Sequence, residues 1–222
     1  MAKRRFLGWV PAIILGAGII AVAVSTSLLV DNGLGAPPTK PTNGQVTDLN
    51  WSIFTPEGLA YIATTREVRI DLSNAPVAAA PLGLADDDTL VLAPIDNVDV
   101  MLDYSLIING GGEGAGGDKF VVPQITIVTE NGVITHVIAP LTEQLNFRQT
   151  LNKLLEKAEL FGWDVSGVDD IYQHVEDASR AGTDYEFSFG PADKAGVPVT
   201  ATARCAPAGG CVLEYDVAPS VR

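Results

Sequence analysis

A chain of 222 residues, of which 47% are hydrophobic and 18% charged, is long enough for one ordinary domain with extensions, and this composition excludes a wholly disordered protein. The formal net charge of −13 at pH 7 argues against nucleic acid as a partner, because acidic side chains add to the phosphate field instead of neutralising it.

The N-terminus contains an uncharged, apolar stretch over residues 6–30. As a helix it would be roughly 37 Å long, more than the ~30 Å of a bilayer's hydrocarbon core. Three basic residues precede it, Lys3, Arg4 and Arg5. Because basic residues stay on the cytoplasmic side, we expect residues 1–5 to be a short cytoplasmic tail, residues 6–30 a transmembrane helix, and the rest to lie outside the cell membrane.

A cleaved signal peptide is the alternative for this stretch. Ala21-Val22-Ala23 fits the small-x-small pattern that precedes a cleavage site after Ala23. The apolar run, however, continues to Val30 and exceeds the ~7–15 residues of a usual signal core, which favours a retained anchor.

Small residues recur at four-residue spacing in the predicted span. Gly8, Ala12 and Gly16 would lie on one helix face, where small side chains let a second helix approach closely. The pattern is compatible with self-association or with a membrane-protein partner.

The part after residue 30 divides into a linker and a domain. Residues 31–47 are rich in glycine, proline, threonine and asparagine and lack apolar periodicity, as linkers do. We expect a folded extracytoplasmic domain over residues 48–222. With 11 basic and 27 acidic residues after residue 30, the exported part has a formal charge of −16.

Strand patterns dominate the first part of the domain. Short apolar or alternating runs predict strands at 49–54, 61–72, 89–93 and 98–108, the last with the clearest alternation. Residues 120–129 and 133–138 predict a hairpin around Asn131-Gly132, the dipeptide preferred in a two-residue turn. Pro123 should place its strand at an edge or a bulge. The register puts His136 among Ile125, Ile127, Ile134 and Ile138, as a partly buried, hydrogen-bonded histidine.

A glycine-rich stretch, residues 107–120, has the spacing of a dinucleotide-binding loop in Gly112, Gly114 and Gly117. Such a loop must run from a strand into a helix, whose N-terminus holds the pyrophosphate. The residues that follow are extended instead. We therefore expect a strand-to-strand connection and no nucleotide.

Two helices and three further strands complete the pattern. Helical spacing of apolar residues predicts helices at 142–161 and 167–181, with Gly162 and Gly182 as their ends and Ser166 with Asp169 as a capping pair. Strands follow at 185–189, 197–204 and 212–217. This order predicts an α+β domain, a mostly antiparallel sheet covered by two helices.

The two cysteines, Cys205 and Cys211, enclose five residues. An exported domain meets an oxidising compartment, so we expect a disulfide bond between them.

Acidic residues crowd two neighbouring turns, and oxygen ligands of this kind suit calcium. The weak candidates are Asp86, Asp87, Asp88, Asp96 and Asp99, although the glycine and distal glutamate of an EF-hand are missing.

No common hydrolase motif occurs in the sequence, so we assign no catalytic or cofactor-binding residue. We expect an interaction or structural role in the cell envelope, without enzymatic activity. Two alternatives stay open: an envelope hydrolase that uses carboxylates assembled by the fold, and a calcium-stabilised surface module.

Overall fold

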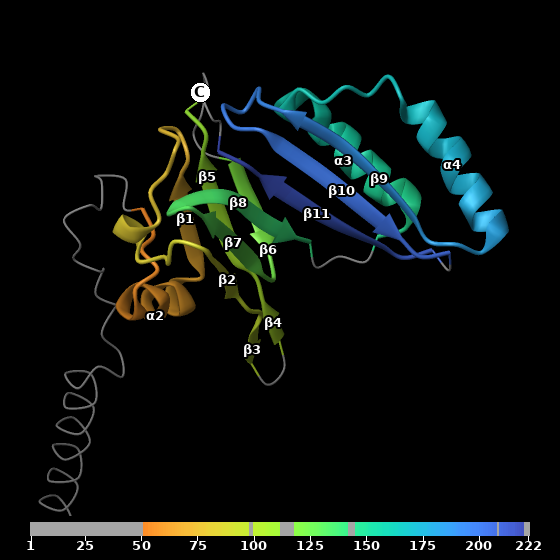
Figure 1. Ribbon diagram of the computed structural model, residues 1–222. Helices are drawn as coiled ribbons and strands as arrows, with labels where there is room; N and C mark the ends of the chain where they lie inside the picture. The colour runs from red at the N-terminus through yellow and green to blue at the C-terminus, as the bar shows by residue number, and fades with distance from the viewer. Residues whose placement is uncertain (1–50, 98–99, 112–117, 142–144, 208, 220–222) are drawn as a thin grey trace, which may run out of the picture. The chain divides into compact units, whose positions relative to one another are not determined.

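The computed structural model describes residues 51–97, 100–111, 118–141, 145–207 and 209–219 (Figure 1). They belong to a compact unit, Lys40–Arg222, which is separate from Met1–Thr39. The predicted tail, membrane span with its small-residue face, and linker therefore lie outside the described residues. Within the described residues, none of the helices has the length and apolar character needed to cross a bilayer.

The described unit is α+β, as the sequence predicts. Its elements in chain order are α2 (Pro56–Thr65), β1 (Glu67–Asp71), the short 3-10 helix η2 (Ala80–Leu82), β2 (Asp88–Leu92), β3 (Ile95–Asn97), β4 (Val100–Leu102), β5 (Tyr104–Asn109), β6 (Asp118–Val122), β7 (Ile125–Glu130), β8 (Val133–Pro140), α3 (Phe147–Phe161), α4 (Val168–Ala181), β9 (Tyr185–Ala192), β10 (Val199–Cys205) and β11 (Cys211–Val217).

The larger sheet has six strands in the order β2-β7-β8-β11-β10-β9, and every neighbouring pair is antiparallel. The predicted hairpin joins β7 to β8, with Glu130 paired to Val133. Asn131 and Gly132 both have positive φ, which is the conformation that this turn requires.

A second sheet of three strands, β1-β5-β6, was not predicted as a separate layer. Here β5 runs parallel to β1 and antiparallel to β6. Its inward side chains, among them Leu106 and Val122, belong to the same buried core as the larger sheet. Strands β3 and β4 form a separate two-stranded pair.

Helices α3 and α4 cover the β9–β11 end of the larger sheet (Figure 1). Helix α3 begins with a capping box, in which Asn146 and Gln149 each bond the other's backbone N–H, and ends at Gly162. Helix α4 also ends at a glycine, Gly182, as predicted. The predicted Ser166–Asp169 cap is wrong, because Gly167 is the N-cap of α4 and no side chain caps it.

Four predicted strands differ from the structure. Residues 61–65 belong to α2, where Thr55 caps the first turn and Pro56 opens it, so the strand begins only at Glu67. Residues 51–54 form no regular element. Asp103 separates β4 from β5, and Pro123, which has no N–H to donate, separates β6 from β7.

Candidate functional site

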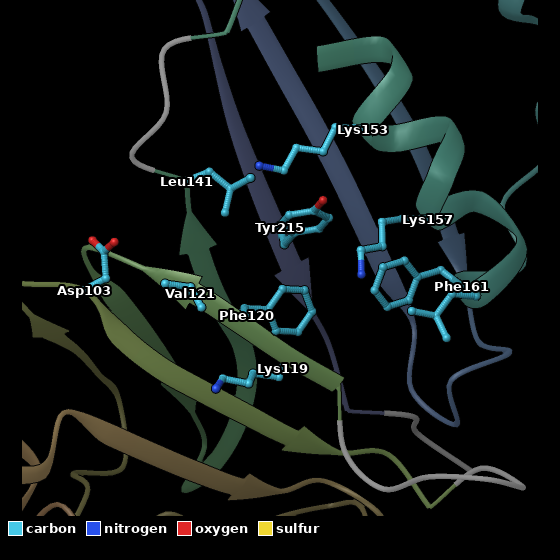
Figure 2. A pocket seen from close by; sticks show the side chains of 10 residues that line it. Asp103, Lys119, Phe120, Val121, Leu141, Lys153, Lys157, Phe161 and Tyr215 are labelled. Atoms are coloured by element: carbon cyan, nitrogen blue, oxygen red, sulfur yellow. The ribbon is translucent and has the colours of Figure 1, made fainter. Parts of the chain in front are cut away.

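A pocket of about 310 Å³ opens between helix α3 and strand β6, over strand β11. Figure 2 shows side chains from these elements around it. The pocket is lined by Asp103, Lys119, Phe120, Val121, Leu141, Lys153, Lys157, Leu160, Phe161 and Tyr215. The three-stranded sheet and α3 form the walls, and each of the three layers contributes one aromatic side chain to the floor, so the pocket exists only where these layers meet.

The floor of the pocket is aromatic. The rings of Phe120 and Phe161 are stacked with centroids 6.2 Å apart, and the ring of Tyr215 lies 5.1 Å from Phe120 and 6.3 Å from Phe161. All three side chains are buried and belong to the core. Because the rings pack on one another, this apolar surface is held in place before any ligand arrives.

Positive charge gathers around this floor. Lys153 and Lys157 lie four residues apart on α3 and therefore share one helix face, and Lys119 comes from β6. These are three of the four lysines in the described residues. With Asp103 the lining has a formal charge of +2, in a chain whose net charge is −13.

The hydroxyl of Tyr215 is the polar group at the centre of the floor. Burial raises the pKa of Tyr215 from its ordinary value of 10.0 to about 12, because the low-dielectric surroundings disfavour the charged phenolate. Figure 2 shows this hydroxyl directed toward the side of the pocket where Lys153 lies. Among the described residues it has no hydrogen-bond partner, and it is therefore available as a donor to a ligand.

Two apolar side chains at the rim are exposed to solvent. Val121 on β6 is 54% exposed and Leu160 on α3 is 46% exposed. They extend the apolar surface of the floor out of the pocket on both walls. The pocket thus combines a rigid aromatic floor, cationic walls and an apolar rim.

The acidic turn is occupied by bonds within the fold. Asp87 accepts the N–H of Asn131 at 2.7 Å, and Asp88 accepts the N–H of Thr89 at 2.7 Å. The backbone oxygen of Asp86 accepts the N–H of Gly132. Within the described part of the chain, no group of three or more histidine, cysteine or acidic side chains could hold a metal ion.

The other two calcium candidates are only partly described. Asp96 pairs with Met101 across β3 and β4, and Asp99 lies outside the described residues. The calcium site over these five residues therefore stays a prediction.

The predicted surroundings of His136 are wrong, because a register shift between Val128 and Thr129 changes the face that follows. Val137 and Ala139 point into the core, while His136 and Ile138 lie on the opposite, partly exposed face. His136 is hydrogen-bonded, as predicted, but its partner is Asp216 on β11, with Nδ1 2.9 Å from a carboxylate oxygen. The pair lies on the face of the sheet away from the pocket.

The glycine-rich stretch connects β5 to β6, which are antiparallel neighbours, and so does not lead into a helix. Residues 112–117 lie outside the described residues. Two glycines before them are packed: a Cβ on Gly110 would lie 2.4 Å from the backbone oxygen of Ala195, and one on Gly111 would lie 2.7 Å from Ser73.

The predicted disulfide between Cys205 and Cys211 is present. The two cysteines are directly paired across β10 and β11, at the end of this hairpin. The bond thus closes the last cross-strand pair before the turn.

The residues of the pocket were not predicted from the sequence. Their positions along the chain, 103 to 215, give no local motif. One signal was available: Lys153 and Lys157 border the apolar face of a predicted helix in a chain that has only six lysines. The partners of these two lysines come from strands whose placement depends on the assembled fold.

Neither a family model nor a curated protein nor a solved structure matches this chain. The function of the chain must therefore be inferred from the residues that line the pocket.

Proposed function

We propose that this chain is a membrane-anchored, extracytoplasmic binding protein that carries out no reaction, and that its ligand enters the pocket between α3 and β6. The observation that carries the proposal is that three lysines and Tyr215 line one pocket with an aromatic floor. Ligand pockets in proteins are typically apolar with a few convergent polar groups.

The location outside the membrane rests on the sequence of the N-terminus. Lys3, Arg4 and Arg5 before the apolar residues 6–30 favour a cytoplasmic N-terminus. The disulfide between Cys205 and Cys211 supports the same location, because such bonds persist in oxidising compartments. Protease treatment of intact cells tests the topology: the C-terminal domain should be digested together with an exported control protein, and its protection would contradict the orientation.

The absence of catalysis is inferred from the pocket's lining. A hydrolase of the kind considered above needs two carboxylates, or His136 with a polar partner, in a pocket. Among the lining residues that the structure describes there is one carboxylate, that of Asp103, and the His136–Asp216 pair lies on the other face of the sheet. None of these described lining residues is a serine, cysteine or histidine that could act as nucleophile or base.

Photo-crosslinking in intact cells tests whether the pocket receives a ligand. A photoreactive phenylalanine analogue would replace Val121, which lies at the rim, in the full-length chain. Val91 is the matched control, because it is also an exposed strand valine, at 47%, but lies on β2 outside the pocket.

We expect an adduct at Val121 that is absent at Val91. Equal adducts at both positions, or none at either, would contradict a binding function of this pocket.

A further inference from the structure

We infer that the ligand of this pocket is an anionic amphiphile: an apolar or aromatic body joined to a phosphate, sulfate or carboxylate group. This inference rests on the proposed binding function and names the chemical class that the α3–β6 pocket selects. It follows from the charge, the rim and the size of the pocket together.

The anionic group is required by the charge of the lining. The three ammonium groups of Lys119, Lys153 and Lys157 outnumber the single carboxylate of Asp103. Among the described residues, Lys119 and Lys157 have no hydrogen-bond or ion-pair partner. The excess of positive charge in the lining favours a ligand with an anionic group.

The apolar body is required by the rim. A bare inorganic anion would not contact the exposed apolar side chains at the rim, Val121 and Leu160. A ligand body that covers Val121 and Leu160 gains free energy from buried apolar area. The lysine stems contribute to the same apolar surface, since their methylene groups lie along it while the ammonium groups stay solvated.

The position of Tyr215 indicates where the anionic group of the ligand would lie in the pocket. The hydroxyl of Tyr215 is a neutral donor, because a phenol is protonated at physiological pH. It lies on the side of the pocket toward which Lys153 extends from α3 (Figure 2). An anion at that point would lie near the Tyr215 phenol and the Lys153 side chain, while the body extends toward the apolar rim at Val121 and Leu160 (Figure 2).

The size of the pocket limits the ligand. A volume of about 310 Å³ equals the share of liquid occupied by roughly ten water molecules. It therefore accommodates one headgroup with a ring or a short chain, and a longer chain would continue past Val121 and Leu160. Two sources share this chemistry: a soluble anionic metabolite, and the headgroup and first methylenes of an anionic lipid in the membrane that would anchor the domain.

Calorimetric titration of the full-length chain in phosphatidylcholine nanodiscs tests the class. Three probes are compared, with empty nanodiscs as the blank: 2-naphthyl phosphate, 2-naphthol, which lacks the anion, and inorganic phosphate, which lacks the body. We expect 2-naphthyl phosphate to bind about tenfold or more tightly than either fragment. Equal affinity for 2-naphthol and 2-naphthyl phosphate would overturn the anionic class while leaving a binding pocket.

The lysine variants give the second arm. Replacing the pocket lysines together, Lys119→Gln, Lys153→Gln and Lys157→Gln, should weaken 2-naphthyl phosphate about tenfold or more, and 2-naphthol little. Lys194→Gln is the control with the same chemical change, since Lys194 lies outside the pocket and donates to the Glu159 backbone oxygen at 2.6 Å. An unchanged affinity in the triple variant would overturn the inference.

A third arm does not depend on the folding of variants. In the wild-type chain, raising the salt concentration from about 50 mM to about 500 mM should weaken the phosphate probe several-fold and leave 2-naphthol unchanged, because ions screen the lysines. A phosphate probe that is insensitive to salt would contradict the role of the lysines.

Nanodiscs that contain phosphatidylglycerol distinguish the two sources. Competition by this lipid against 2-naphthyl phosphate identifies a lipid headgroup, and its absence identifies a soluble ligand. If no probe binds while Val121 still crosslinks in cells, the ligand class is wrong and the binding function stands. If Val121 does not crosslink either, the function itself fails.

Discussion

The indole N–H of Trp163 donates a hydrogen bond of 2.8 Å to the backbone oxygen of Val199, inside the core. Trp163 directly follows Gly162, the residue that ends α3, so this bond fixes the end of the helix to strand β10. Its ring also packs 4.8 Å from Phe161 and 6.3 Å from Tyr215. The tryptophan therefore supports the aromatic floor of the pocket from below.

Replacing Trp163 by phenylalanine should lower the free energy of unfolding by about 1–3 kcal/mol, because the buried hydrogen bond is lost and the core loses volume. Urea unfolding followed by circular dichroism measures the difference. Trp51→Phe is the control, since Trp51 is only partly buried. Equal stabilities of wild type and Trp163→Phe would show that the bond to Val199 contributes little.

Gly190 lies beside the same hydrogen bond and has a φ of 96°. A Cβ at this position would lie 2.4 Å from the Val199 oxygen and 3.0 Å from the Trp163 indole nitrogen. Gly190→Ala should therefore lower the free energy of unfolding by about 2–4 kcal/mol, through both strain and steric overlap.

Gly182→Ala separates the two causes. Gly182 also has a positive φ, of 68°, but a Cβ there would meet nothing within 4 Å. Its replacement should cost only the conformational strain, about 1 kcal/mol. Similar losses at both glycines would mean that the contact at Gly190 relaxes without cost.

Tyr215 makes the free energy of unfolding depend on pH in the alkaline range. Its folded pKa of about 12 lies above the ordinary value of 10.0, so the unfolded chain releases this proton first as the pH rises. The free energy of unfolding should therefore be unaffected below about pH 10 and fall between pH 10 and 12, by roughly 2–3 kcal/mol in total. Burial also raises the pKa of Tyr104 and Tyr185, which act in the same direction.

The comparison with Tyr215→Phe isolates the contribution of this residue. The variant should lose less stability over the same pH interval, and absorbance at 295 nm should show one fewer tyrosine with a high pKa. A Tyr215 that ionises near pH 10 in the folded protein would contradict its burial in the floor.

The disulfide bond stabilises a single short hairpin. Closing the loop between Cys205 and Cys211, a separation of six residues, removes only a small chain entropy from the unfolded state. Replacing both cysteines by alanine should lower the free energy of unfolding by on the order of 2 kcal/mol and leave a folded domain. Complete unfolding of the double variant at room temperature would show that the domain depends on the bond far more than its loop length implies.

The connection between β5 and β6 should tolerate shortening. Deleting residues 113–116 leaves enough chain for a hairpin, and loop entropy changes slowly with length, so the free energy of unfolding should change by less than about 1 kcal/mol. Gly110→Ala should cost more, because its Cβ would overlap the backbone oxygen of Ala195. Unfolding of the deletion variant would reveal a packed role for the connection.

The features that were predicted correctly from the sequence are those that depend on residues close together in the chain. The Asn131-Gly132 turn, the glycine ends of α3 and α4 and the cysteine pair follow from conformations and bonds that neighbouring residues decide, and the structure confirms each. The α+β class followed from the order of these elements.

The errors concern features that local patterns do not reveal. The surroundings of His136 were wrong because β8 has one extra residue at Thr135, which the alternation of residue types does not reveal: Val128 pairs with His136, but Thr129 pairs with Ile134. The pairing of β1 with β5 joins segments almost forty residues apart, and no local pattern specifies it. The pocket could not be predicted for the same reason, since Lys119 and Tyr215 meet only after both sheets have packed.

Because the pocket is built from two sheets and α3, binding of a ligand should stabilise the packing of these three layers on one another. A ligand that contacts α3, β6 and β11 together binds only while the three-stranded sheet is packed on the larger one. It therefore stabilises the contact between the two sheets. At a concentration of about 100 times its dissociation constant it would add roughly 2.7 kcal/mol to the free energy of unfolding. The melting temperature of the whole domain can therefore serve as a general assay for candidate ligands, including ones whose identity is not known in advance.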